Sequence, residues 1–412
     1  MKKILISGAS VAGPVLAHWL HRYGFEPTLV ERTPAGRHGL GGHAVDLFSS
    51  AADITRRMGC WDAIEAARTR LDAMTIERFG KRPVEVDLSR MYAGISTRHV
   101  EILRGELTRI LYAATRDTAE YVFGDSIAAV HDDGAGVDVT FESGAQRRFD
   151  LVIGADGLHS NVRRLVFGPE EPMLRPLGGY LAVFSMPDVF GLGNHTLSHF
   201  SVGKLVGIYG VHQTGQVRAG FLFRAPEVRY DYRDKDEQKA LLVKEFRDYG
   251  WKVPQLLEHL VPAEDFYFDS IAQITLDTWH RGRIGLVGDA GYCPGPAVGG
   301  GTSLAVMAAY ILAGELAAAR SDLPSGLRNY ERTIRPVVEQ SRRFAPKVMR
   351  TIIPAGPLAL RLMPTAAATL AKLPTSVQRF IWSQNSVGKA LSSVPMPDYS
   401  DLVQPERGQP VT

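Results

Sequence analysis

Short apolar runs that end in glycine-rich turns recur along this chain, and segments with helical spacing of apolar positions follow them. The first run, Ile4–Ile6, leads through the turn Gly8–Gly13 into residues 14–22, whose apolar positions fall on one helical face. A second apolar run, Pro27–Val30, ends at Glu31. This order of strand, turn, helix, strand and acidic residue is typical of a βαβ unit that binds a dinucleotide.

Each position of this unit has a physical role. Gly8 permits a sharp turn and Gly13 lets the helix pack closely on the sheet, while free backbone N–H groups at a helix N-terminus favour a pyrophosphate. Glu31 is placed to accept hydrogen bonds from an adenosine ribose. Ser10 stands where the middle glycine of the fingerprint is expected, and an ordinary βα turn is the alternative interpretation. The candidate cofactor residues here are Gly8, Ser10, Val11, Ala12, Gly13, Glu31 and Arg32.

Two later stretches repeat the pattern of a buried strand with a polar tip. Asp150–Gly154 leads to Asp156, and Ser160 is placed to cap a helix over residues 161–167. Arg283–Val287 leads to Asp289, followed by prolines and three glycines before an apolar helix over residues 303–319. Both aspartates are therefore expected at the same crevice as the first turn.

From residue 178 to 279 the pattern changes to alternating β runs, interrupted by a charged helix over residues 234–249. A strand pair is also predicted within residues 74–91. This pattern predicts a separate, mostly antiparallel sheet with one face towards a ligand. Aromatic residues are frequent in it, mostly for packing, and the candidates for a substrate cavity are Tyr180, Phe200, Tyr209, Phe221 and Phe223.

Composition narrows the class of protein. The 412 residues, 45% hydrophobic and 22% charged, are typical of a soluble globular protein with two or three domains. A net charge of +3 is too small to indicate nucleic-acid binding. Two cysteines, Cys60 and Cys293, lack metal-ligand spacing, so we expect no metal and a reducing, cytoplasmic location. No apolar run reaches the roughly 18 residues of a membrane span, so no integral membrane segment is expected.

Taken together, Gly8–Gly13 with Glu31, Asp150–Arg163 and Gly288–Gly301 resemble the motifs of the flavoprotein monooxygenases that include para-hydroxybenzoate hydroxylase. The resemblance spans about residues 3–345. It implies an α/β fold with a Rossmann-like FAD-binding domain of the glutathione-reductase type, the antiparallel β-sheet substrate domain and a C-terminal helical region. The expected FAD-binding domain is discontinuous (1–72, 95–175 and 280–345); the substrate domain covers 73–94 and 176–279, and C-terminal helices and a tail cover 346–412.

The resemblance also implies roles for individual residues. Asp289 would bind the flavin ribitol, and Arg104 would contact the phosphate-ribitol region. The segment from Gly41 to Leu47 is most similar to the tetracycline-modifying branch, where the aspartate, here Asp46, touches FAD and an upstream arginine contacts NADPH. Arg37 and Arg163 are accordingly hypotheses for NAD(P)H binding, with NADPH favoured. The FAD residues implied by the three motifs are completed by Asp156, Pro296, Val298, Gly299, Gly300 and Gly301.

The sequence departs from the family pattern near the flavin ring. Gly291-Tyr292 replaces Ala-His, Gly300 replaces a common glutamine, and Ser303 replaces a frequent asparagine. These differences lie on the substrate side of the flavin and leave the FAD motifs intact.

The family chemistry predicts that NAD(P)H reduces FAD and that O2 then forms a flavin C4a-hydroperoxide, which hydroxylates an aromatic or polyketide-like substrate. The protein would be a monomer or homodimer. One alternative is an FAD-dependent reductase or oxidase of an isoprenoid lipid, suggested by the apolar stretch over residues 349–373. Another is a flavin-binding protein without turnover.

Overall fold

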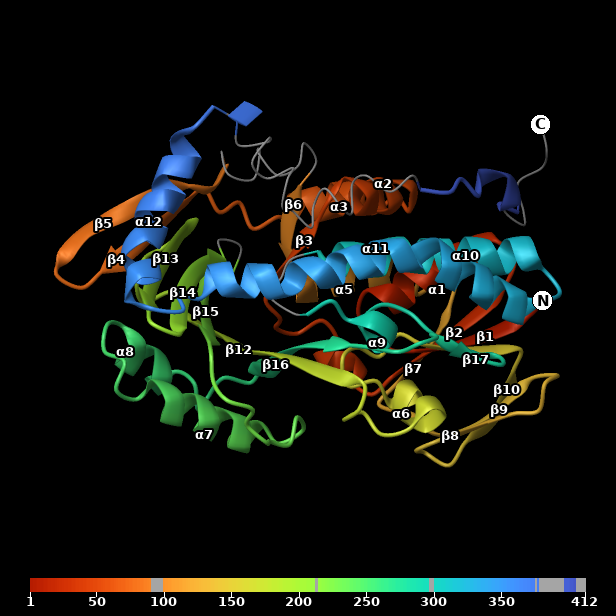
Figure 1. Cartoon of the computed structure of the whole chain (residues 1–412). Helices are drawn as coiled ribbons and strands as arrows, with labels where there is room; N and C mark the ends of the chain where they lie inside the picture. Colours follow the sequence, from red (N-terminus) through yellow and green to blue (C-terminus); the bar gives the residue numbers. More distant parts are fainter. Residues whose placement is uncertain (90–98, 212–213, 296–299, 375, 378–395, 405–412) are drawn as a thin grey trace.

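The computed structural model describes residues 1–89, 99–211, 214–295, 300–374, 376–377 and 396–404. A six-stranded sheet and a seven-stranded sheet lie side by side, and a long helix runs across both (Figure 1). The predicted α/β class, with an FAD-binding fold, a largely antiparallel second sheet and C-terminal helices, is confirmed.

The six-stranded sheet has the order β17-β18-β11-β1-β2-β7. Its central strands are parallel, and Ile6 of β1 lies between Leu29 of β2 and Ile153 of β11. Because parallel strands end at the same edge, the three predicted tips meet there. The strands are β1 (Lys3–Ser7), β2 (Glu26–Glu31), β7 (Glu120–Phe123), β11 (Leu151–Gly154), β17 (His280–Arg281) and β18 (Ile284–Leu286).

Three helices form the main hydrophobic core with this sheet: α1 (Ala12–Arg22), α10 (Gly301–Ala319) and α11 (Leu323–Ile352). α10 packs against both α1 and α11. It has the length and mean hydropathy of a membrane span, but 78% of its apolar window is buried inside the protein. The apolar composition of α10 is therefore explained by its position in the core.

Smaller elements surround the crevice. Ser160 caps α6 as predicted, its hydroxyl accepting the N–H of Arg163. The helix that begins at Trp61 ends at Ala66, and Arg70 beyond it has a φ of +54°, which a helix does not tolerate. These elements are η1 (Ala35–Arg37), β3 (Ala44–Leu47), α2 (Ser49–Arg57), α3 (Trp61–Ala66), β6 (Val100–Leu103), α5 (Arg104–Ala113), β8 (Ile127–Asp132), β9 (Val137–Phe141), β10 (Gln146–Phe149), α6 (Asn161–Phe167) and α9 (Asp289–Tyr292).

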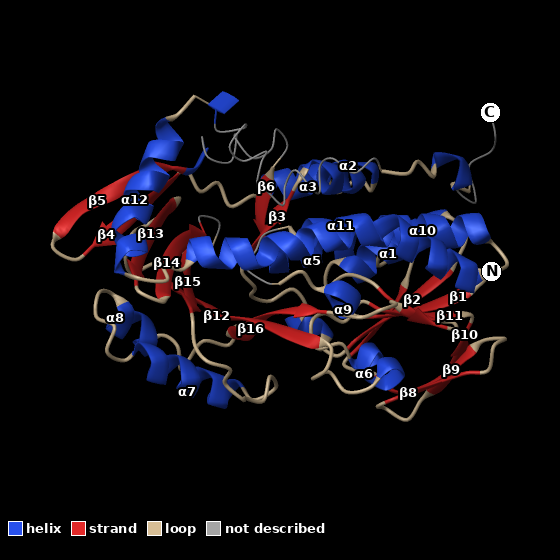
Figure 2. Ribbon diagram, in the orientation of Figure 1, coloured by secondary structure: helices blue, strands red, loops and turns tan. Residues whose placement is uncertain are grey.

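The seven-stranded sheet has the order β16-β12-β15-β14-β13-β4-β5 (Figure 2). Only the β4–β13 pair in it is parallel. β12 begins at Leu174, before the alternating pattern that is expected from residue 178, because β16 continues to pair with it past an irregularity between Pro176 and Tyr180. The strands are β4 (Ala73–Arg78), β5 (Lys81–Asp87), β12 (Leu174–Pro187), β13 (His195–Ser201), β14 (Lys204–Val211), β15 (Gln216–Phe223) and β16 (Tyr267–Ile274).

The two faces of this sheet have different neighbours. α7 (Lys235–Phe246) and α8 (Val253–Glu258) cover one face and enclose an aromatic core with it. On the other face, the end of α11 contributes Met349 to a cluster with Leu181 and Val183. α12 (Pro357–Lys372) packs against β5. α11 thus links the two sheets (Figure 1).

The C-terminal tail contacts helices that pack on the six-stranded sheet. Its described part, residues 396–404 with η2 (Ser400–Leu402), docks on α10 and α1. The Tyr399 ring is buried over Gly314, and its hydroxyl donates to Glu315 Oε1 at 2.7 Å. The buried Tyr399 ring, together with the Gln404 N–H that donates to the Arg22 carbonyl oxygen at 2.9 Å, anchors this segment.

Candidate active site

The turn after β1 is packed too tightly for side chains. Gly8 has a φ of +104°, and a Cβ on it would lie 2.5 Å from the Ala155 carbonyl oxygen. A Cβ on Gly13 would lie 2.0 Å from the Gly8 oxygen. Both glycines are therefore required where β1, β11 and α1 meet, which is the role predicted from their spacing.

Glu31 holds this turn from the tip of β2. Its carboxylate accepts the backbone N–H of Ala9 at 2.9 Å and that of Thr33 at 2.9 Å. Ser10 faces Thr108 of α5, with the two hydroxyl oxygens 3.2 Å apart. Val11 and Ala12 are buried at the start of α1, so they offer a ligand mainly backbone groups.

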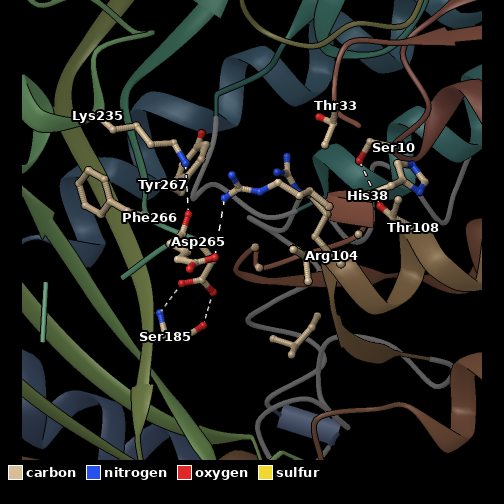
Figure 3. Close-up of a pocket in the computed structure, with 18 of the residues that line it drawn as sticks. Ser10, Thr33, His38, Arg104, Thr108, Ser185, Lys235, Asp265, Phe266 and Tyr267 are labelled. Atoms are coloured by element: carbon tan, nitrogen blue, oxygen red, sulfur yellow. Dashed lines mark hydrogen bonds and ion pairs between the residues drawn. The ribbon is translucent and has the colours of Figure 1, made fainter. Parts of the chain in front are cut away.

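A cavity of about 1720 Å³ begins at this turn and extends to the seven-stranded sheet (Figure 3). One dinucleotide or drug-sized ligand needs less space, since such sites typically measure about 300–1,000 Å³. Of the predicted cofactor residues, the cavity is lined by Gly8, Ser10, Glu31, Arg32, Arg104 and Asp156.

Asp156 closes the inner wall of the cavity at the end of β11. Its carboxylate accepts the N–H of Val162 at 3.0 Å and the hydroxyl of Ser160. Burial raises its pKa, while the hydrogen bonds of Ser160 and Val162 oppose that shift. Asp156 thus organises the start of α6 beside the first turn.

Arg104 begins α5 and reaches into the middle of the cavity (Figure 3). Its backbone N–H donates to the His43 carbonyl oxygen at 3.0 Å, and its guanidinium lies 5.9 Å from the centre of the Tyr267 ring. A Cβ on Gly105 would lie 2.3 Å from the Gly39 oxygen, so the glycine-rich loop after β2 packs directly on α5. The loop therefore lies directly beside the Arg104 side chain, which a Cβ on Gly42 would meet at 3.2 Å.

Asp289 lies at the third strand tip, at the start of α9. It does not line the cavity. Burial raises the pKa of its carboxyl group, and the Cys293 side chain and the nearby Arg104 guanidinium oppose that shift. Gly300 has a φ of +83° and precedes the first turn of α10, which begins at Gly301. Pro296, Val298 and Gly299 lie outside the described residues.

Asp46 does not line the cavity. One of its carboxylate oxygens is 2.6 Å from His99 Nε2, and its carbonyl oxygen accepts the Ser303 hydroxyl at 2.9 Å. The same hydroxyl oxygen accepts the N–H of Phe48 at 2.9 Å. Asp46 is therefore tied through Ser303 to the start of α10, where the flavin ring is expected.

The two arginines expected to bind NAD(P)H have different positions. Arg37 lines the cavity and is exposed, with a weak ion pair of 3.9 Å to Glu264 across the opening. Arg163 is fully buried, pairs with Glu170 and donates to the Ala290 oxygen at 2.8 Å. Because no part of this guanidinium reaches the cavity, the structure does not support a nucleotide contact at Arg163.

The aromatic residues proposed as cavity lining require a correction, since none of the five lines the cavity. Tyr180, Phe221 and Phe223 are buried in the core under α7. Phe200 packs in the cluster with Ile76, Val86 and α12. Tyr209 lies between the sheets, where its hydroxyl accepts the N–H of Ala44 at 3.1 Å. Periodicity places a residue on a face of a strand, but it does not say which face a helix will cover.

Cavity residues from the second sheet were missed, because loops and single strand positions supply them without a motif. Tyr267 contacts both His43 and Arg104. Asp265 accepts the N–H of Ser185 at 3.0 Å, and its side chain lies against Gly41. A lone basic residue inside an apolar strand, Arg218, was the only signal available in the sequence.

Comparisons with known proteins agree with this nucleotide-binding geometry. The family described as FAD binding domain matches residues 1–345. The chain belongs to this family. An uncharacterized protein of Mycobacterium tuberculosis is 44% identical over 344 residues, which are 83% of this chain and 92% of that protein. A flavin-dependent monooxygenase of Legionella longbeachae is 39% identical, covering 83% of this chain and 87% of that protein.

Among solved structures, the tetracycline destructase Tet(55) has a TM-score of 0.82 and 36% identity, with 97% of this chain and 99% of that chain covered. The resemblance to flavoprotein monooxygenases is thus confirmed. Membership of this family shows that the cofactor is FAD. The turn Gly8–Gly13, Glu31 and Arg104 lie around one cavity and fit this cofactor; we call them the FAD cradle.

Proposed function

We propose that this FAD-dependent monooxygenase uses NADPH, in preference to NADH, and O2 to hydroxylate an aromatic or polyketide-like small molecule. The observation that carries the proposal is the single cavity that runs from Glu31 past Arg104 to Arg218. It connects the nucleotide-binding turn with the sheet that would receive the substrate. A binding protein without turnover has no need of this connection.

Different residues of the chain would bind different parts of FAD. Glu31 would bind the adenosine ribose, N–H groups of the first turn would face the pyrophosphate, and Arg104 would lie beside its outer oxygens. Asp289 and the backbone at Gly300 and Gly301 would hold the ribitol and the ring. When bound, FAD accepts hydride from NAD(P)H and activates O2 for transfer of one oxygen atom.

The start of α10 supplies electrostatics at the ring. α10 has 19 residues, so its aligned peptide dipoles leave a partial positive charge at Gly301. This charge would stabilise negative charge that gathers on the ring of bound FAD. Tyr267 and His43 pack beside Arg104 and help to exclude water, which would otherwise divert the activated oxygen.

Purified protein loaded with FAD tests the proposal. We expect NADPH oxidation and O2 uptake that increase with a phenol or polycyclic compound, together with a product heavier by one oxygen atom. Anaerobic reduction of an isoprenoid alkene would support the reductase alternative, and protein that takes up no flavin would contradict both.

Three further assignments remain proposals. We infer that the chain has three parts. The FAD-binding domain covers residues 1–72, 95–175 and 280–345, and the substrate domain covers 73–94 and 176–279. The C-terminal helices and tail cover 346–412. A cytoplasmic location is supported by two buried, free cysteines, Cys60 and Cys293. A monomer or homodimer without nucleic acid is consistent with the low net charge of +3.

A further inference from the structure

The C-terminal region differs from the rest of the chain in its charge. Residues 340–397 contain eight lysine and arginine residues and no aspartate or glutamate; we call them the acid-free segment. All 44 acidic residues of the chain lie outside it, so the net charge of +3 results from a basic segment and a net acidic remainder. Two of the eight basic residues, Arg379 and Lys389, lie outside the described residues.

α12, within this segment, directs leucine side chains away from the protein. Leu358 and Leu362 are 70% and 59% exposed. Ala367 and Ala371 pack in the cluster that joins α12 to β4 and β5. Leu358 precedes Ala367, and Leu362 precedes Ala371, by nine positions, or about two and a half turns, so the leucines lie on the opposite side of the helix. A surface helix normally turns its leucines inward, and α12 does the reverse.

The end of α11, just before α12, carries a row of positive charges. Arg343, Lys347 and Arg350 are exposed, and their spacings of four and three positions place them on one face of the helix. Lys347 and Arg350 form no ion pair with a described carboxylate, and Arg343 reaches Glu339 only at 4.0 Å. Arg361, between the two leucines of α12, is also exposed and has no ion pair within the described part of the chain. The protein itself therefore leaves these charges largely unpaired.

The turn between the two helices is fixed to the substrate sheet. The Arg224 guanidinium donates to the Met349 carbonyl oxygen at 2.8 Å and to the Ile353 carbonyl oxygen at 3.0 Å. The Gly203 N–H donates to the Pro354 carbonyl oxygen at 2.8 Å. These bonds hold the start of α12 in place, so the fold itself keeps its leucines outward. α12 and β1 lie at opposite ends of the molecule, and binding at α12 would leave the first turn of the FAD cradle open (Figure 1).

We propose that the corner formed by Lys347, Arg350, Leu358, Arg361 and Leu362 binds the surface of an anionic lipid bilayer. The leucines would enter the boundary between head groups and acyl chains, as the apolar face of an interfacial helix does. The basic side chains would lie among the lipid phosphates, where each Lys or Arg strengthens binding about fivefold. This surface lies outside the active site, so the inference does not depend on the proposed function.

The charge pattern favours a bilayer over other partners. A second copy of this chain, bound through the same corner, would bring the basic residues of both copies together, and the acid-free segment has no carboxylate side chain to pair with them. An interface with another protein is typically depleted in lysine. Nucleic acid would bind the basic residues but leave the leucines exposed to water. An anionic bilayer uses both kinds of side chain.

Flotation of the full-length, FAD-loaded protein with lipid vesicles tests the proposal. One set of vesicles contains phosphatidylcholine alone, and the other contains phosphatidylcholine and phosphatidylglycerol in equal amounts. We expect binding to the anionic vesicles to be tighter by about tenfold or more, and to weaken as salt is raised, because salt screens exposed charges. Equal binding to both sets, or binding to neither, would overturn the proposal.

A pair of charge variants assigns the binding to this corner. The double variant Lys347→Gln with Arg350→Gln should bind anionic vesicles about ten- to thirtyfold more weakly than wild type. Lys244→Gln with Arg247→Gln is the matched control, because it removes one exposed lysine and one exposed arginine at the same spacing, at the end of α7. The control should bind like wild type, and equal weakening in both double variants would overturn the assignment.

A leucine variant tests the apolar part of the contact. Leu358→Gln should weaken binding about tenfold, because it removes apolar surface that would otherwise leave water. Leu358→Phe should retain binding. Val189→Gln, at an exposed apolar position outside the acid-free segment, should have no effect. The thermal midpoints should match that of wild type, since these side chains contribute little to the core.

The remaining outcomes separate this inference from its competitors and from the proposed function. Wild-type binding in Leu358→Gln would overturn the insertion of α12. A dimer in sedimentation of vesicle-free wild type that is lost in Leu358→Gln would identify a second copy as the occupant and overturn the bilayer. Flavin content and NADPH oxidation should be equal in all variants, and their failure in wild type would contradict the proposed function while leaving the vesicle result valid.

Discussion

His159 and Asp269 connect the two sheets at the wall of the cavity. The His159 Nε2 lies 3.2 Å from each carboxylate oxygen of Asp269, and its Nδ1 lies 2.7 Å from Glu170 Oε1. Asp269 also accepts the Tyr230 hydroxyl at 3.0 Å. Burial by itself lowers the pKa of His159, but hydrogen bonds to Asp269 and Glu170 outweigh burial and raise that pKa to about 9. The imidazolium therefore holds residues from both sheets together.

This pair predicts a dependence of stability on pH. The folded-state pKa of about 9 lies above the ordinary value of 6.5, so the stabilisation is complete below pH 6.5 and is lost as pH rises through 9. At about 1.4 kcal/mol per pKa unit, its upper limit is about 3 kcal/mol. Urea unfolding of wild type and His159→Gln should differ most at pH 6 and converge near pH 10. A difference that stays constant over this range would contradict the ionic link.

Gly13→Ala should abolish FAD uptake. The new Cβ would lie 2.0 Å from the Gly8 oxygen, so α1 would have to move away from β1 and open the cradle. Gly36→Ala is the matched control, because a Cβ there meets no atom of the described residues within 4 Å. Flavin absorbance of the purified proteins measures the effect, and a yellow Gly13→Ala protein would show that the turn tolerates this shift.

Glu31→Gln should weaken FAD binding about ten- to a hundredfold, because a hydrogen bond to a charged group contributes roughly 1.5–3 kcal/mol. The amide also places a donor against one of the N–H groups of Ala9 and Thr33. Glu26→Gln, at the exposed start of the same strand, controls for the loss of charge. Isothermal titration of the apoprotein with FAD distinguishes the two variants, and equal affinities would argue against the ribose contact.

Arg37→Ala should raise the KM for NADPH about tenfold while leaving FAD affinity unchanged, since Arg37 lies at the opening of the cavity. Its ion pair with Glu264 spans 3.9 Å between exposed side chains and contributes little to stability. Glu264→Gln removes that pair but keeps the arginine, so it should leave the KM unchanged or lower it. Steady-state kinetics with NADPH and NADH provide the measurement; an unchanged KM in Arg37→Ala would exclude this contact.

Ser303→Ala should destabilise the protein by about 1–3 kcal/mol, because the Phe48 N–H and the Asp46 carbonyl oxygen would lose their shared buried partner. The start of α10 would also lose its link to β3. Thermal unfolding with and without FAD should show a lower midpoint in both states. A midpoint equal to that of wild type would mean that water replaces the hydroxyl.

The nucleotide cradle was predictable because its residues act through local geometry. Gly8, Gly13 and Glu31 lie within one continuous βαβ unit, so their spacing alone places them at one turn. The positions of Asp156 and Asp289 could also be anticipated, since parallel strands end at a common edge. The buried position of Arg163 could not, because its partner Glu170 and the Ala290 carbonyl oxygen come from other segments.

The sequence by itself determined where the strands, turns and helices of the FAD cradle lie, because these follow from short-range periodicity and from backbone conformations open to glycine. Only the tertiary structure decided which face of the second sheet α7 covers and which face lies towards the cavity. Tyr180 and Phe221 alternate along their strands just as Arg218 and Gly220 do. α7 covers the face that carries Tyr180 and Phe221, and the FAD cradle lies towards the face that carries Arg218 and Gly220. Packing between distant parts of the chain determines this arrangement.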